Sequence, residues 1–158
     1  MKKFEFTGET KTISLFFRTA TLHRIRAVAE FGLVKVGDLG GWIEKEENLS
    51  HEGKAWVWGN AEVWGNAEVC GDAKVFSARH VLVIGAMGSR DDFTTFFRDK
   101  DNEITVKCGC FLGKIDKFLE KVTQTHGDSK YALVYRAAVE VARLQIDLSG
   151  EAPKDADE

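Results

Sequence analysis

A six-residue repeat in the middle of the chain constrains the fold more than any other feature. Written in sixes from Gly53, residues 53–82 read GKAWVW, GNAEVW, GNAEVC, GDAKVF and SARHVL. Alanine takes the third place four times, and valine takes the fifth place five times. Because residues two apart on a strand face the same side, we expect both to point inward. Gly-Asn or Gly-Asp then forms the corner, since glycine adopts positive φ at little cost.

Three such strands and three corners would close a triangular coil of 18 residues, which predicts a short left-handed parallel β-helix. The frame extends weakly back to Gly41, so this β-helix is expected over residues 41–82. The alternative is a plain antiparallel meander, which would need a matching turn at every sixth residue. Seven hexads make little more than two coils, so the ends of the array need caps or neighbouring subunits.

The positions that this frame turns outward carry large apolar side chains. A coil of 18 residues places Trp58 beneath Phe76, for example. Apolar groups on the outside of a coil must be covered by the terminal segments, by another subunit or by a stacked ligand. If another subunit covers them, the protein is a homo-oligomer, a dimer or trimer, whose interface contains Trp56, Trp58, Trp64 and Phe76.

The segments on either side of the repeat predict two further parts. Residues 1–40 form an N-terminal β cap, with short strands expected at 3–6, 13–18 and 22–28. Residues 83–148 form an α+β module, so the chain as a whole is mainly β with an α+β C-terminal part.

The α+β module is predicted to contain a three-stranded antiparallel sheet and then two helices. The first helix should end near His126-Gly127, where glycine suits a C-cap. Residues 91–98 fit either a strand or a helix, and we favour the strand because threonine and phenylalanine suit a pleated surface. The acidic segment 149–158 is expected to be disordered.

Composition excludes several classes of function. The 158 residues carry a net charge of −3, all of which lies in the tail 150–158, with four acids and one lysine. The neutral body argues against a nucleic-acid groove, which needs clustered basic charge. We expect neither a signal peptide nor a membrane span, since no apolar run approaches about 18 residues. Three cysteines form no disulfide framework, so a cytoplasmic protein is expected.

A glycine-rich turn after a strand predicts an anion site. In Gly85-x-x-Gly88-Ser89-Arg90, backbone amides can approach an anion closely and the guanidinium can clamp a phosphate. A plain turn that binds nothing is the alternative. If a ligand is bound, we expect it to be anionic and to lie beside Gly85, Gly88, Ser89, Arg90, Thr94, Thr95, Arg98 and Lys107.

Neither a metal nor a cofactor is expected. Cys108 and Cys110 share one face of a strand end, but zinc requires about four ligands, and Cys70 and the four histidines lack ligand spacing. His80 is the best candidate for a general base, and it has no acid partner at a fixed spacing.

Two stretches carry a resemblance to known proteins. The first is Gly37-Asp38-Leu39-Gly40-Gly41-Trp42-Ile43-Glu44, followed by Glu47-Asn48-Leu49-Ser50 and the Gly-Asn-Ala-x-Val array. The second is 84–126, with Cys108-Gly109-Cys110-Phe111 and Gly113-x-Ile115-Asp116. Both resemble small phage and prophage proteins with hexapeptide-like repeats, and together they cover most of residues 20–146.

Small viral proteins of this kind often bind and disable bacterial defence components. The resemblance therefore implies a non-enzymatic binding protein in the host cytoplasm, which neutralises a host component. It would bind a host protein or sequester a small nucleotide signal. Analogy with hexapeptide-repeat acyltransferases, which use a histidine at an inter-subunit cleft, gives an enzyme as the alternative, and a structural assembly module is a third reading.

Overall fold

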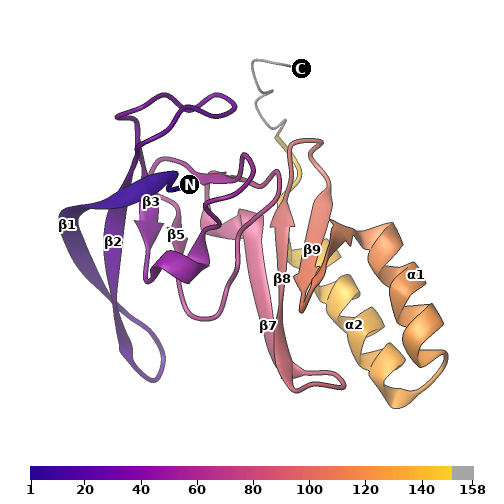
Figure 1. Cartoon of the computed structure of the whole chain (residues 1–158). Coiled ribbons are helices and arrows are strands. Elements are labelled where there is room, and N and C mark those ends of the chain that lie inside the picture. Colours follow the sequence, from indigo (N-terminus) through magenta and orange to yellow (C-terminus); the bar gives the residue numbers. More distant parts are fainter. Residues whose placement is uncertain (151–158) are drawn as a thin grey trace.

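The structure of the chain is a computed structural model, and it describes residues 1–150 (Figure 1). Residues 151–158 of the predicted disordered tail lie outside the described range. The N-terminal half contains a sheet in the order β1-β2-β3-β5. Its strands are β1 (Phe4–Ser14), β2 (Thr19–Ala27), β3 (Leu39–Ile43) and β5 (Glu62–Val63). β1, β2 and β3 pair antiparallel, whereas β3 and β5 pair parallel.

The C-terminal half is an antiparallel sheet in the order β10-β9-β8-β7, packed against two helices (Figure 1). The strands are β7 (Val81–Met87), β8 (Asp92–Arg98), β9 (Ile104–Cys108) and β10 (Phe111–Lys114). The helices are α1 (Ile115–His126) and α2 (Lys130–Gln145). Between the two halves lie the parallel pair β4 (Trp56–Val57) and β6 (Lys74–Val75) and the 3₁₀ turns η1 (Glu46–Asn48) and η2 (Ala78–His80).

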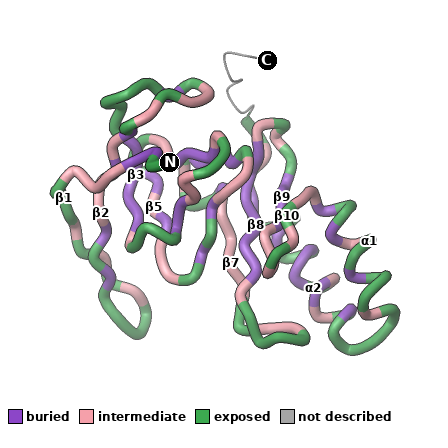
Figure 2. The backbone as a smooth tube through the Cα atoms, in the orientation of Figure 1, coloured by how far each residue is buried: buried purple, intermediate pink, exposed green. Residues whose placement is uncertain are grey.

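Strand β8 joins the two halves, because both of its faces are covered. Figure 2 shows this strand buried along most of its length. On one face, Phe97 packs into the core of the repeat and Thr95 Oγ1 accepts a hydrogen bond of 3.0 Å from Glu68 N. On the other face, Phe96 packs against the helices, with its ring centre 6.5 Å from that of Phe118. Burial on both faces explains why this strand has no polar alternation.

The predicted left-handed β-helix is wrong. The hexads form strands of only two residues, and these are divided between different sheets: β5 joins the N-terminal sheet, whereas β4 pairs only with β6. Longer antiparallel strands that lie mostly outside the repeat supply most of the sheet hydrogen bonding. A short repeat cannot stack enough coils to bury its own ends, and the flanking segments determine the architecture instead. The fold is mixed α and β, with several small sheets.

The prediction that the alanines and valines of the repeat point inward is nevertheless confirmed. The alanines at the third place and the valines at the fifth place of the first four hexads are all buried, namely Ala55, Ala61, Ala67, Ala73, Val57, Val63, Val69 and Val75. The prediction of outward-facing side chains fails at three positions, Trp56, Lys74 and His80, which are all buried. Trp56, only 1% exposed, lies beneath the rings of Phe4 and Phe31, and Lys74 is also buried. The N-terminal segment therefore covers this tryptophan, which agrees with the expectation that terminal segments cover the large apolar side chains of the repeat.

The C-terminal elements agree with their sequence patterns more closely. Residues 92–98 form a strand rather than a helix, and both helices are present. The first helix ends at Gly127, which has φ 58°. The predicted three-stranded sheet lacks one strand, β10, which pairs with β9 across a short turn. At the N-terminus, the expected strand 13–18 is wrong, since Leu15–Arg18 forms the turn of the β1–β2 hairpin.

Candidate functional site

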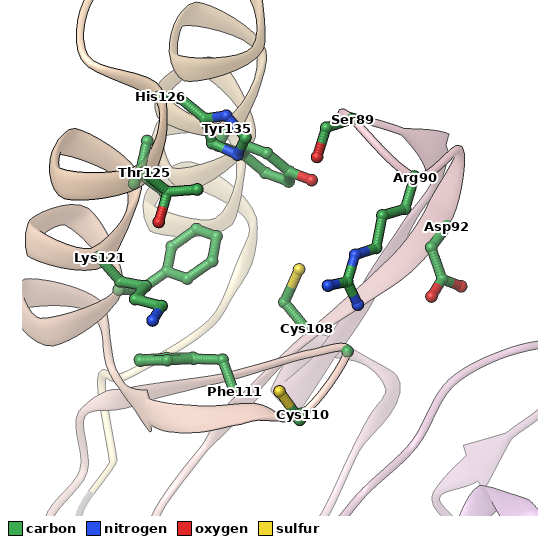
Figure 3. A pocket seen from close by; sticks show the side chains of 13 residues that line it. Ser89, Arg90, Asp92, Cys108, Cys110, Phe111, Lys121, Thr125, His126 and Tyr135 are labelled. Carbon is green, nitrogen blue, oxygen red and sulfur yellow. The ribbon is translucent and has the colours of Figure 1, made fainter.

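A pocket of about 180 Å³ opens between the helix pair and two turns of the C-terminal sheet (Figure 3). The β7–β8 turn contributes Ser89 and Arg90, and the β9–β10 turn contributes Gly109 and Cys110. The remaining wall comes from α1 and α2. The pocket thus brings together segments from three regions of the C-terminal half.

Two cationic side chains approach this pocket from opposite sides. Figure 3 shows the Arg90 guanidinium on the side of the turns and the Lys121 ammonium on the side of α1. Within residues 1–150, neither side chain forms a hydrogen bond or an ion pair. Asp92 is the single acidic residue in the lining, and in Figure 3 its carboxylate points away from the space between the two cations. The rim therefore favours an anion.

The interior of the pocket is aromatic. Phe118 contacts Tyr135 edge to face, with ring centres 5.8 Å apart and planes at 90°. Phe111 lies 5.5 Å from Phe118, and His126 stacks on Tyr135 at 5.7 Å. Aromatic walls with a few convergent polar groups are typical of small-molecule sites.

Gly88 has a packing role at this site. Its φ is +78°, and a β-carbon at this position would overlap the hydroxyl of Tyr135. Because glycine lacks a β-carbon, the tyrosine ring can pack directly against the β7–β8 turn. Gly85 similarly leaves room for Phe93. The absence of a side chain at these two glycines thus shapes the turn.

Two free thiols line the pocket. Cys108 accepts a hydrogen bond of 3.3 Å from Thr94 Oγ1, and Cys110 is exposed at the turn. Among the described residues, no cluster of three or more histidine, cysteine or acidic side chains is placed to hold a metal.

Only some of the residues predicted to bind an anion lie at the pocket. Ser89 and Arg90 line the pocket, and Thr94 lies beneath it through its bond to Cys108. Thr95 instead faces the repeat. Lys107 donates to Gly109 O and lies 3.9 Å from Glu68.

Arg98 lies at the far end of β8, where its side chain contacts residues of the repeat and stabilises the fold. The side chain is 4% exposed, its Nε donates to Lys74 O at 3.1 Å, and its guanidinium covers the ring of Phe76. Strand β8 spans seven residues, so Arg90 and Arg98 cannot meet one small ligand.

Sequence reasoning missed the helical side of the pocket. Lys121, Thr125, His126 and Tyr135 all lie on or at the ends of α1 and α2. The spacing of apolar residues predicted the two helices, but no local pattern indicates which turn those helices pack against. The available signal was the pair Lys121 and Thr125, which share a helix face at i and i+4.

His80, the candidate base, is built into the core. It is buried, and its Nδ1 accepts a hydrogen bond of 3.0 Å from Phe76 N. Burial lowers the pKa of His80, and the positive charge of Arg98 lowers it further. The imidazole is therefore held neutral, as part of the turn at η2.

The predicted interface residues do not form one surface. Trp56 is buried, whereas Trp58 and Trp64 are half-buried and Phe76 is partly exposed. Trp58 stacks on Phe76, while Trp64 packs near the β1–β2 hairpin beside Trp42.

No protein-family model matches this sequence, and no curated protein is significantly similar to it. Within residues 1–150, no helix is both long enough and apolar enough to cross a membrane. The function of this protein is therefore inferred from the geometry of the pocket.

Proposed function

We propose that this protein is a non-enzymatic binding protein whose pocket takes a small anion that carries a planar ring. One observation carries the proposal. Arg90 and Lys121 face each other across an aromatic pocket, and neither is neutralised by a partner within residues 1–150. A guanidinium without a partner beside aromatic walls suits the phosphate or carboxylate of a ring-bearing ligand.

The size of the pocket limits how much of a ligand it encloses. Small-molecule sites usually have volumes of roughly 300–1,000 Å³, and this pocket has about 180 Å³. The space therefore suits a single ring between Phe111, Phe118 and Tyr135, with the charged group at the rim. A nucleotide base or another aryl group fits this description, and the rest of the ligand would extend beyond the rim.

The contacts of the thiols favour binding over catalysis. A catalytic thiol needs a general base within hydrogen-bond reach. Within residues 1–150, no hydrogen bond joins His126 to Cys108 or Cys110, and the His126 ring stacks on Tyr135. The acyltransferase reading depended on a β-helix, so the observed fold removes its basis.

The resemblance to phage and prophage proteins supports a biological setting for this site. In that setting the protein neutralises a bacterial host component by sequestering a small anionic signal, such as a nucleotide. The pocket favours a small ligand over a host protein as the target, because its charged rim encloses a space the size of one ring.

The proposal is tested by titrating the protein with phenyl phosphate, phenol and inorganic phosphate, followed by nuclear magnetic resonance. We expect phenyl phosphate to bind at least about tenfold more tightly than either fragment, because it uses both the cations and the rings. Adenosine 5′-monophosphate and adenosine form the second pair of probes.

Matched variants locate the site. Arg90→Ala and Lys121→Ala should each weaken the binding of phenyl phosphate. Arg79→Ala and Lys117→Ala should leave it unchanged, because both residues are exposed and lie outside the pocket lining. Equal affinity for phenol and phenyl phosphate, or equal loss in the control variants, would contradict the proposal.

A further inference from the structure

The β9–β10 turn places two thiols in one wall of the aromatic pocket. Cys108, the last residue of β9, pairs with Phe111 of β10, so the turn between them consists of Gly109 and Cys110. Both cysteines are free, and both line the pocket. In the view of Figure 3, their sulfur atoms lie between the Lys121 ammonium and the Arg90 guanidinium. The pocket therefore contains a dithiol beside two cations.

The two thiols are near enough in the chain to be joined by a disulfide bond. Consecutive α-carbons lie about 3.8 Å apart, so those of Cys108 and Cys110 are separated by at most about 7.6 Å. The turn at Gly109, which has φ 58°, keeps them below this limit. Disulfides join residues whose α-carbons are roughly 4.4–6.8 Å apart. Because glycine tolerates many backbone conformations, Gly109 lets the turn adjust as the bond forms.

The three cysteines of the chain differ in their access to solvent. Cys110 is exposed, whereas Cys108 is half-buried and its sulfur accepts the 3.3 Å hydrogen bond from Thr94 Oγ1. Cys70 packs against the core of the repeat instead, where burial raises its pKa to about 11. Since the thiolate is the form that attacks a disulfide, Cys70 stays unreactive at neutral pH. Cys110 is thus the thiol that a reagent in solution contacts first.

The charge around the dithiol favours an anionic reagent. Arg90 and Lys121 have no ion-pair partner within residues 1–150. Arg90 also lies against the turn itself, because a β-carbon at Gly109 would be 3.5 Å from Arg90 Nη1. Charges of one sign around a cleft raise the local concentration of oppositely charged reactants. A disulfide that carries carboxylates should therefore react with this dithiol faster than a cationic disulfide does.

We propose that Cys108 and Cys110 form a modification site, at which a small disulfide that carries carboxylates converts the dithiol into an intramolecular disulfide. This covalent reaction goes beyond the reversible binding of a ligand, although it rests on the cations of the same pocket. Each chain reacts once, so the protein remains non-enzymatic.

The exchange balances without a further reactant. The Cys110 thiolate attacks one sulfur of the reagent, a bond forms between these two sulfurs, and the S–S bond of the reagent breaks. The first reagent thiol leaves and takes up the proton that Cys110 lost. The Cys108 thiolate then attacks the sulfur of Cys110, and the second reagent thiol leaves with the proton of Cys108. The chain loses two electrons and two protons, and the reagent gains them as it becomes two thiols.

Mass spectrometry of the full chain after exposure to an excess of glutathione disulfide tests the site. The reaction is stopped with acid, the chain is unfolded, and the remaining free thiols are alkylated with iodoacetamide. We expect Cys70 to be alkylated, while Cys108 and Cys110 are linked to each other. In Cys108→Ser, glutathione should stay attached to Cys110, because no second thiol displaces it.

A comparison of reagents separates the effect of charge from simple exposure. Arg90→Ala with Lys121→Ala should slow the reaction with glutathione disulfide at least about tenfold, because it removes the cations that attract the reagent. The same variant should not slow the reaction with cystamine, a cationic disulfide. Arg79→Ala with Lys117→Ala is the matched control and should react as wild type does, because both residues are exposed and lie outside the pocket lining.

Three results would overturn the proposal. The first is wild-type protein in which glutathione stays on Cys110 and no bond to Cys108 forms. The second is alkylation of all three cysteines after the exposure. The third is an equal rate with glutathione disulfide in wild type and in the variant that lacks Arg90 and Lys121. None of these measurements uses phenyl phosphate, so a failure of this site is distinguishable from a failure of the proposed ligand binding.

Discussion

The rings of Trp58 and Phe76 stack face to face, with their centres 4.6 Å apart and their planes within 3°. The parallel pairing of Val57 with Val75 brings the two rings into register. Lys74 Nζ lies 5.2 Å from the centre of the Trp58 ring, and the Arg98 guanidinium lies 5.3 Å from that of Phe76. This stack covers the outer side of the β4–β6 pair.

A double-mutant cycle with Trp58→Leu and Phe76→Leu should measure the stack directly. We expect a coupling of about 0.5–1.5 kcal/mol in the free energy of unfolding, as for other aromatic pairs. Urea denaturation of the four proteins gives this value. Trp64 makes no ring contact with Phe76 within residues 1–150, so the cycle of Trp64→Leu with Phe76→Leu should be additive. Equal coupling in both cycles would show that the stack has no specific energy.

Val63→Asp should unfold the repeat, whereas Glu62→Ala should change stability little. Val63 is 2% exposed, and an unpaired charge there costs on the order of 4 kcal/mol. Glu62 is partly exposed and pairs with Lys11, a contact worth about 0–1 kcal/mol. Thermal melting followed by circular dichroism checks this. Similar melting temperatures for the two variants would contradict the inward frame.

Arg98→Ala should destabilise the fold, whereas Arg90→Ala should not. Removing Arg98 leaves Lys74 O without its 3.1 Å donor and uncovers Phe76, which costs about 1–3 kcal/mol. Arg90 is exposed and has no partner within residues 1–150, so its loss should affect only the binding of phenyl phosphate. Melting temperatures and titrations of both variants separate the two roles. The prediction fails if Arg90→Ala melts as early as Arg98→Ala.

Gly88→Ala should disturb the pocket by displacing Tyr135. The added methyl group would overlap the Tyr135 hydroxyl, so the ring must move out of the pocket wall. We expect binding of phenyl phosphate to fall by about tenfold or more. Gly8→Ala is the matched control, because Gly8 also has positive φ but open space around its position. Unchanged binding in Gly88→Ala would mean that Tyr135 does not shape the site.

Stability should fall as the pH drops below about 6.5, the ordinary pKa of histidine. Burial lowers the pKa of His80 in the folded chain, so the unfolded chain takes up a proton first. Protonation of Nδ1 would also remove the acceptor for Phe76 N. Urea denaturation at pH 7.5 and pH 5.5 measures the loss. His80→Gln should reduce it, and an equal loss in that variant would assign the effect to other groups.

The sequence predicts the C-terminal helices well because their signals are local. The apolar spacing of residues 115–122 defines one helix face, and Gly127 ends the helix because it adopts positive φ. The same holds for the alanine and valine places of the repeat, whose burial follows from the two-residue period of a strand.

The candidate site is only partly predictable. The turn with Ser89 and Arg90 is visible as a glycine-rich motif, and it does line the pocket. Lys121 and Tyr135 are not predictable, because their place opposite Arg90 depends on how two helices pack on a sheet. Arg98 shows the opposite error, since closeness in sequence suggested a shared site and the length of β8 separates it from Arg90.

The sequence by itself thus determined which side chains of each short segment point inward, including the register that stacks Trp58 on Phe76. Only the tertiary structure decided what covers the opposite faces. Trp56 is buried because Phe4 and Phe31 pack over it, and β8 is buried because the repeat and the helices cover both of its faces. The physical reason is that periodicity is a property of neighbours along the chain, whereas burial of the second face depends on the packing of distant segments.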